Sequence, residues 1–231
     1  MKIAVMQPYF FPYIGYWQLM ASVDRFVIFD DANYISRGWI NRNRILLHGK
    51  PFLFTIPLSK SSQNRKINEI DMDENLRIMR KTLKTFETAY KKAPYYEETM
   101  PLVGGVLERK GNFSRILIDS INSINRHIGL KTEIFTSSTL RTDTWMDAQT
   151  KIVTQVKALN GTEYHNPIGG THLYDKAFFA QHNLILRFVR PDLRLYRQFE
   201  NPFIPGLSLI DVLMFNGAEK TGRMVQRYSY E

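Results

Sequence analysis

The sequence predicts an α/β protein with a mostly parallel sheet and a helical middle section. At the N-terminus, two short apolar segments, residues 2–6 and 25–29, flank a short helical pattern. An alternation of strand and helix patterns resumes after Thr132, and an amphipathic helical pattern occupies residues 71–128. A strand, a helix and a second strand in this order are typical of the right-handed crossover unit of a parallel sheet.

The composition limits the class of protein. With 231 residues, of which 44% are hydrophobic, the chain can bury a proper core, and we expect one domain over residues 1–231 that contains the helical section 71–128. The 31 basic and 22 acidic residues give a formal charge of +9. This charge favours an anionic partner, such as a phosphate, a nucleotide sugar, nucleic acid or an anionic membrane surface.

The chain contains no cysteine, which excludes disulfides, thiol catalysis and cysteine-based zinc sites and is typical of a reducing compartment. The apolar run at the N-terminus is too short for a signal peptide, and no run approaches the roughly 18 apolar residues of a transmembrane helix. We therefore expect a cytoplasmic protein without a transmembrane segment.

The N-terminal unit places two loops on one edge of the predicted sheet. The strand over residues 2–6 precedes an extended loop shaped by Pro8 and Pro12, and a short helix follows, which starts at residue 13 or 15 and ends near residue 20. The second strand ends in Asp30 and Asp31. Because parallel strands end on the same edge, residues 7–12 and 30–33 should lie side by side. Residues 52–58 are predicted to form a third strand.

Helices and strands follow in the rest of the chain. Helices are predicted over residues 71–93, 94–109 and 112–128, the first capped by Asp71 or Asp73 and the last closed by Gly129. The second half predicts, in order, a strand at 132–135, a helix at 145–160, a strand with a glycine loop at 162–174, a short helix capped by Asp175 and ending near 181, and a strand at 184–189.

Aromatic residues crowd the loop after the first strand. We predict that Gln7, Tyr9, Tyr13 and Tyr16 bind a substrate, because a tyrosine offers both a ring face and a hydroxyl donor. Phe10, Phe11 and Trp17 are better suited to the core. The alternative is that the prolines shape the loop and the rings only cover the edge of the sheet.

Charged residues lie next to this loop in the prediction. Asp30 or Asp31 is a candidate general base for an amino nucleophile, or a contact to a ribose or a metal, although aspartate is also common in strand-end turns. Three arginines stand within eight residues, and Arg37 and Arg42 are our candidates for binding a phosphate or carboxylate. The alternative is that these two arginines and Arg44 are only surface cations.

The glycine loop after residue 165 is a second candidate. Asn166, Gly169 and Gly170 stand at a predicted strand end, where such a loop can cradle an anion or let Tyr174 reach the site, unless it is a plain turn. The histidines at 165, 172 and 182 lack the spacing of a zinc site, so no metal is predicted. The basic stretches at 60–66 and 91–92 are interpreted as solvated surface, and residues 220–224 as the end of a C-terminal helix.

Several segments together resemble the bacterial WbqC-like family over essentially the whole chain. They are the opening Met6–Leu19, the strand end Asp24–Asp31, Trp39–Arg44, Asn166–Gly170 with Leu173–Asp175, and Pro205–Asn216. The resemblance implies a role in the synthesis of O-antigen and other surface polysaccharides, and it suggests glycine (aminoacyl) transfer. It implies no particular catalytic residue.

The segment from Tyr13 to Tyr16, Tyr-Ile-Gly-Tyr, is similar to the His-Ile-Gly-His signature of nucleotidylyl transferases and class I aminoacyl-tRNA synthetases. This similarity implies a Rossmann-like or nucleotidylyl-transferase-like sheet, with ATP or a nucleotide sugar as the candidate cofactor. The imidazoles of the signature stabilise charge on a phosphate. Tyrosine carries no positive charge at neutral pH, but Gly15 would still permit close approach of the backbone to a ligand.

Three classes of function fit the sequence. The first is a transferase that attaches an aminoacyl or other acyl group to an amino sugar on a nucleotide-linked or lipid-linked carrier. The second is an enzyme that activates an amino acid with ATP, which pyrophosphate exchange would reveal. The third is a non-catalytic module that binds nucleic acid, with tRNA as a candidate, or a carrier; the net charge favours it, but no nucleic-acid-binding motif supports it.

Overall fold

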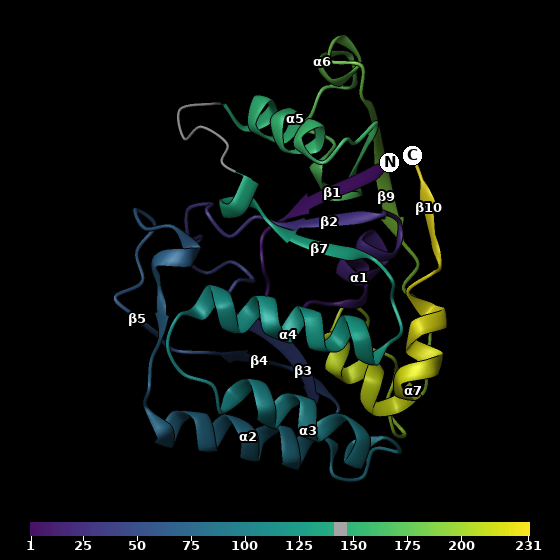
Figure 1. Cartoon of the computed structure of the whole chain (residues 1–231). Helices are drawn as coiled ribbons and strands as arrows, with labels where there is room; N and C mark the ends of the chain where they lie inside the picture. The colour runs from purple at the N-terminus through teal and green to yellow at the C-terminus, as the bar shows by residue number, and fades with distance from the viewer. Residues whose placement is uncertain (141–146) are drawn as a thin grey trace.

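The structure is a computed structural model that describes residues 1–140 and 147–231. At its centre is a six-stranded sheet in the order β10-β9-β8-β1-β2-β7 (Figure 1). β1, β2, β7, β8 and β9 run parallel, and β10 pairs antiparallel with β9. The strands are β1 (Lys2–Met6), β2 (Arg25–Ile28), β7 (Glu133–Thr136), β8 (Glu163–Pro167), β9 (Ile185–Pro191) and β10 (Tyr228–Tyr230). The prediction of an α/β protein with a mostly parallel sheet is confirmed.

The order of the parallel strands reverses once. From β7 to β9 across the sheet, the five parallel strands come third, second, first, fourth and fifth in the chain. The reversal lies between β1 and β8. The chain passes from β1 to β2 and β7 on one side of β1, and it then continues to β8 and β9 on the other side. In open α/β sheets, ligands bind outside the carboxyl ends of the strands at such a switch point. The topology therefore directs attention to the residues that follow β1, β2 and β8.

Helices cover both faces of the sheet (Figure 1). On one face lie α5 (Ala148–Ala158) and α6 (Lys176–Gln181), and on the other lie α1 (Ile14–Ala21), α4 (Phe113–His127) and α7 (Leu209–Met224). Side chains alternate along a strand. Ile3 and Val5 therefore pack in the apolar core on the side of α5 and α6, whereas Ala4 packs in the core on the side of α1, α4 and α7.

The helical middle section packs against a hairpin outside the main sheet (Figure 1). It contains α2 (Leu76–Tyr90), α3 (Tyr96–Leu107) and α4, and the hairpin consists of β3 (Arg42–Leu47) and β4 (Lys50–Thr55). A small ladder of β5 (Leu58–Ser59) and β6 (Asp71–Met72) lies beside them. One buried apolar cluster joins this section to the sheet face that carries α1.

The predicted strand over residues 52–58 is partly wrong. β4 ends at Thr55 and pairs antiparallel with β3, which the sequence analysis did not predict. His48 and Gly49 connect the two strands with φ of +51° and +72°. A two-residue turn with positive φ at both positions is the connection that matches the twist of a hairpin.

The predicted helix boundaries are mostly confirmed, with one correction. Asp71 lies in β6, and α2 begins after Asn75, whose side chain accepts a hydrogen bond from the backbone N–H of Arg77. Asp175 caps α6 and Gly129, with φ of +72°, closes α4, as predicted. Residues 220–224 lie in α7. The first two residues of the helix predicted at 145–160 fall outside the described residues, and α5 begins after its cap Asp147.

Short 3₁₀ helices complete the chain at Ile67–Glu69 (η1), Ser137–Leu140 (η2) and Ile168–Gly170 (η3). Two of them, η2 and η3, directly follow β7 and β8 on the carboxyl edge of the sheet. Over the described ranges, no helix is both long enough and apolar enough to cross a membrane.

Candidate functional site

The carboxyl edge of the sheet gathers residues from four strands. β1 and β2 are neighbours in register, with Met6 opposite Ile28, so the loops that begin at Gln7 and Phe29 leave the sheet together. The backbone N–H of Phe29 donates to the carbonyl of Met6 at 2.8 Å. Residues 7–12 and 30–33 were predicted to lie side by side, and these contacts place the starts of the two loops together.

Asp30 holds the end of β2 against the end of β7. One carboxylate oxygen accepts from the Ser137 hydroxyl and the Ser138 backbone N–H, both at 3.0 Å, and the other accepts from the Ser138 hydroxyl at 2.6 Å. The residue is only 4% exposed. Three donors around a buried carboxylate suit an anchor between strand ends.

Asp31 forms an ion pair with α5. Its carboxylate accepts from Lys151 Nζ at 2.8 Å and from the Ser137 hydroxyl, and the side chains of Asp31 and Lys151 are 11% and 12% exposed. Lys151 Nζ also lies 4.7 Å from the ring centroid of Phe29. The two aspartates thus share one serine, and the role of a proton acceptor remains a prediction for both.

The glycine loop after β8 is ordered by the Asn166 amide, which donates to the Tyr164 hydroxyl at 2.7 Å. A Cβ at Gly170 would stand 2.1 Å from Asn166 Oδ1, so only glycine fits there without displacing the amide. Tyr174 meets the Tyr164 ring edge to face at 5.6 Å, and burial raises its pKa. Gly169, in contrast, has open space around its Cβ position.

An aromatic pocket of about 300 Å³ opens beside the loop that follows β1. We define the aromatic pocket by its lining residues, Tyr9, Pro12, Tyr13, Trp39, Asn43, Arg44 and Gly206. Two of the predicted binding residues, Tyr9 and Tyr13, therefore lie in one cavity. Burial, with a smaller contribution from Tyr13, raises the pKa of Tyr9 to about 12, so its hydroxyl is a neutral donor at physiological pH.

Tyr16 and Gly15 lie beneath this pocket and support it. The Tyr16 side chain is buried, its hydroxyl donates to the Gln7 carbonyl at 3.2 Å, and its ring centroid is 5.8 Å from that of Tyr9. A Cβ at Gly15 would stand 2.5 Å from the Tyr13 ring. The glycine therefore makes room for Tyr13 on the first turn of α1.

Arg44 supplies the positive charge of the aromatic pocket. One of its terminal nitrogens donates to the Gly206 carbonyl at 3.3 Å, and its guanidinium carbon lies 5.5 Å from the Trp39 ring centroid. Its Nε is buried and has no hydrogen-bond partner. Arg44 forms no ion pair within the described ranges, so the guanidinium keeps donor capacity for an anion.

The two predicted arginines lie elsewhere. Arg42 is half-buried, donates from Nε to the Gly38 carbonyl at 2.7 Å and lies 5.9 Å from the Trp39 ring, but it does not line the pocket. Arg37 is exposed, with φ of +60°. Sequence reasoning missed Arg44 and Trp39 as site residues. The alternation of a strand over 42–47 would have put Arg42 and Arg44 on one face, but nothing local indicates which of them meets Gly206.

Asn43 fixes the loop that walls the pocket. Its amide donates to the carbonyls of Phe10 and Phe11 at 3.0 and 2.7 Å, and the residue is 4% exposed. The Ser208 hydroxyl donates to the same Phe11 carbonyl at 2.8 Å. Phe11 itself has φ of +45°, an unusual value for a bulky residue, and these bonds hold it there.

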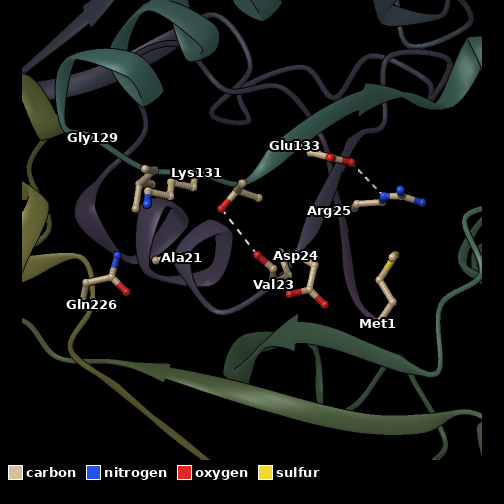
Figure 2. Close-up of a pocket in the computed structure, with 11 residues that line it drawn as sticks. Met1, Ala21, Val23, Asp24, Arg25, Gly129, Lys131, Glu133 and Gln226 are labelled. Carbon is tan, nitrogen blue, oxygen red and sulfur yellow. Dashed lines mark hydrogen bonds and ion pairs between the residues drawn. The ribbon is translucent and has the colours of Figure 1, made fainter.

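A different hollow of about 530 Å³ lies at the opposite edge of the sheet (Figure 2). It is bordered by the amino ends of β1, β2 and β7, and the Arg25–Glu133 ion pair of 2.9 Å crosses one side of it (Figure 2). Because α/β sheets bind ligands at the carboxyl ends of their strands, we place the candidate site at the aromatic pocket instead. Within the described residues, no group of three or more histidine, aspartate or glutamate side chains could hold a metal.

The model of the WbqC-like protein family matches residues 7–223, from the loop after β1 to the last turn of α7. The chain belongs to the WbqC-like protein family. This WbqC-like protein is also 27% identical to the uncharacterized protein Rv1507c of Mycobacterium tuberculosis, over 94% of this chain and 95% of that relative. No solved structure matches the chain. The resemblance drawn from the sequence is confirmed, and the match includes every residue of the aromatic pocket.

Proposed function

We propose that this WbqC-like protein is a transferase of bacterial surface-polysaccharide synthesis, such as O-antigen synthesis, that binds an amino sugar carrying a phosphate. The group transferred is an aminoacyl group, such as glycine, or another acyl group. The observation that carries the proposal is Arg44, a half-buried cation that lines an aromatic cavity and whose buried Nε has no hydrogen-bond partner.

The walls of the aromatic pocket suit a sugar. Rings such as those of Tyr9, Tyr13 and Trp39 can pack against the apolar faces of a pyranose, and the tyrosine hydroxyls can donate to its oxygens. A guanidinium recognises phosphate with two parallel hydrogen bonds. The volume of about 300 Å³ is that of a small-ligand site. The net charge of +9 also favours a phosphorylated substrate.

The sheet supports a nucleotide-linked substrate. We propose that the fold is of Rossmann-like type, because its five parallel strands follow the 3-2-1-4-5 order of doubly wound nucleotide-binding sheets. The loop that walls the aromatic pocket begins at the carboxyl end of β1, next to the reversal of strand order.

The chemistry is acyl transfer to an amine. The sugar nitrogen forms a bond to the acyl carbon, the bond from that carbon to the donor's leaving group breaks, and the nitrogen passes a proton to a base. We assign the base to Asp31 rather than Asp30, because Asp30 is buried at 4% exposure with three donors, whereas the Asp31 side chain is 11% exposed and has two donors, Lys151 and Ser137. Holding the amine and the acyl donor together supplies much of the rate.

Activation of an amino acid by ATP is the second candidate, since the Tyr-Ile-Gly-Tyr segment does lie at the start of α1. In the similar signature, the imidazoles stabilise charge on a phosphate. Here Tyr16 is 3% exposed and its hydroxyl is used by the Gln7 carbonyl. We therefore favour transfer over adenylation.

The test measures the binding of UDP-glucosamine, a nucleotide-linked amino sugar, by thermal unfolding and by calorimetric titration. A ligand at 100 times its dissociation constant stabilises the folded state by about 2.7 kcal/mol, which raises the melting temperature measurably. We expect Arg44→Gln to weaken binding at least tenfold. Arg115→Gln, on the exposed surface of α4, makes the same charge change away from the pocket and should bind like the wild type.

Two results would contradict the proposal. The first is that UDP-glucosamine produces no shift and no heat while ATP does, which would favour adenylation. The second is equal binding by the Arg44→Gln protein and the wild type, which would show that the ligand does not bind in the aromatic pocket.

A further inference from the structure

A third cavity, of about 660 Å³, lies between α2, the turn of the β3–β4 hairpin and residues 199–201. We call it the lysine pocket. Its lining residues are Leu46, His48, Gly49, Lys84, Glu87, Thr88, Ala89, Lys91, Lys92, Phe199 and Asn201.

The lysine pocket is strongly cationic. Lys84 and Thr88 are four residues apart, which puts them on one face of α2, and Lys91 and Lys92 stand in the turn that follows the helix. None of the three lysines forms an ion pair among the residues described. Glu87 is the one acidic residue in the lining. Three ammonium groups around one open cavity favour a ligand with more than one negative charge.

Two segments of the chain contribute lining residues to both the lysine pocket and the aromatic pocket, which have no lining residue in common. On β3, Arg44 lines the aromatic pocket and Leu46 lines the lysine pocket, and residues two apart on a strand face the same side about 7 Å from each other. The other segment comprises residues 199–208, in which Phe199 and Asn201 line the lysine pocket and Gly206 lines the aromatic pocket. The Ser208 N–H donates to the Arg44 carbonyl at 2.8 Å, and Asn201 Oδ1 lies 2.5 Å from a Cβ position at Gly49.

We propose that the two pockets bind one ligand, a sugar diphosphate, with the sugar in the aromatic pocket and the diphosphate at Arg44 and the lysine pocket. This inference rests on the proposed function and names its substrate class. A diphosphate presents several anionic oxygens in a short span, and it would meet Arg44 on β3 and the lysines of α2 and of the turn that follows it. The carrier beyond the diphosphate is a nucleoside or a lipid.

The first experiment uses inorganic pyrophosphate, which has the diphosphate without the sugar, in calorimetric titrations. We expect Lys84→Gln/Lys92→Gln to weaken pyrophosphate binding at least tenfold. The matched control is Arg77→Gln/Lys81→Gln, which removes two exposed charges from the same helix outside both pockets. If the control weakens binding as much as the lysine variant, or if neither does, the lysine pocket is not a diphosphate site and the proposal is wrong.

The second experiment tests whether one ligand occupies both pockets. UDP-glucosamine should bind more tightly than pyrophosphate, and both Arg44→Gln and Lys84→Gln/Lys92→Gln should weaken it. If only the lysine variant weakens it, the aromatic pocket and the proposed function fail together, and so does the joined site. If only Arg44→Gln weakens it, the proposed function stands and the extension into the lysine pocket is wrong. Glucosamine linked through a diphosphate to farnesol identifies the carrier: tighter binding than UDP-glucosamine supports a lipid, and weaker binding supports a nucleoside.

Discussion

Replacement of Gly15 by alanine gives the sharpest test of how the aromatic pocket is built. The new methyl group would stand 2.5 Å from Cε2, Cζ and Oη of Tyr13, a distance that real contacts do not reach. The ring must therefore swing away from the first turn of α1. Since Tyr13 lines the aromatic pocket, the change removes one wall without touching Arg44.

Two opposing terms set the effect on stability. Alanine is favoured over glycine inside a helix by about 1 kcal/mol, and overpacking costs about 1–3 kcal/mol. We expect a net loss of about 0–2 kcal/mol for Gly15→Ala. Gly104→Ala in α3 is the matched control, because nothing lies within 4 Å of its Cβ position and only the helical gain remains.

The assay is urea unfolding of four proteins: the wild type, Gly15→Ala, Tyr13→Ala and the double variant. Once the ring is absent the methyl group meets nothing, so the glycine change should be less costly in the Tyr13→Ala background by about 1–3 kcal/mol. UDP-glucosamine binding should fall in Gly15→Ala and remain unchanged in Gly104→Ala. The reasoning is refuted if Gly15→Ala stabilises the protein as much as Gly104→Ala does and shows no coupling to Tyr13.

Two further predictions concern pH. Burial lowers the pKa of His165, so between that pKa and about 6.5 the unfolded chain binds a proton that the folded chain does not, and the free energy of unfolding should rise with pH across this window. His165→Gln should flatten that rise in urea titrations at pH 5 to 8, and an unchanged slope would contradict the assignment. The effect of Asp211 on stability has the opposite sign. Burial raises its pKa above 3.8 despite hydrogen bonds from Tyr196, Gln198 and Tyr90, so the folded chain holds a proton that the unfolded chain has lost. The free energy of unfolding should therefore fall as pH rises from 3.8 through the folded pKa. Asp211→Asn should remove that fall. If the fall persists in the variant, another group causes it.

Local patterns were sufficient for most of the secondary structure. The strands at residues 2–6 and 25–28 and the helices of the middle section are each signalled by apolar periodicity and by a nearby cap or proline. The hairpin was the main failure. β3 contains Arg42, Asn43 and Arg44, whose polarity hides a strand, and its turn uses His48 and Gly49 rather than an asparagine–glycine pair. Only pairing with β4 makes this segment extended.

The candidate site was predicted in part for a similar reason. Tyr9 and Tyr13 could be found because they stand in a loop between a strand and a helix. Gly206, which closes the aromatic pocket, is 162 residues away from Arg44 in the chain. The partners of the two aspartates, Ser137 and Lys151, are likewise more than 100 residues distant. A sequence pattern therefore locates the aspartates but does not tell an anchor from a base.

The polar residues of the N-terminal segment divide according to whether their hydrogen bonds are satisfied inside the protein. Asp30 and Asn43 are buried with their polar groups paired to protein partners, so each of them stabilises the loops. Arg44 differs, because its Nε is buried without a partner. Of the described residues with such an unpartnered atom, it is the one that borders the aromatic pocket, the lysine pocket or the hollow of Figure 2. A buried donor without a partner costs about 1–3 kcal/mol, and an anion whose oxygen reached this Nε would recover that free energy on binding. We therefore propose the aromatic pocket as the ligand site on the unsatisfied donor of Arg44 rather than on the density of polar residues.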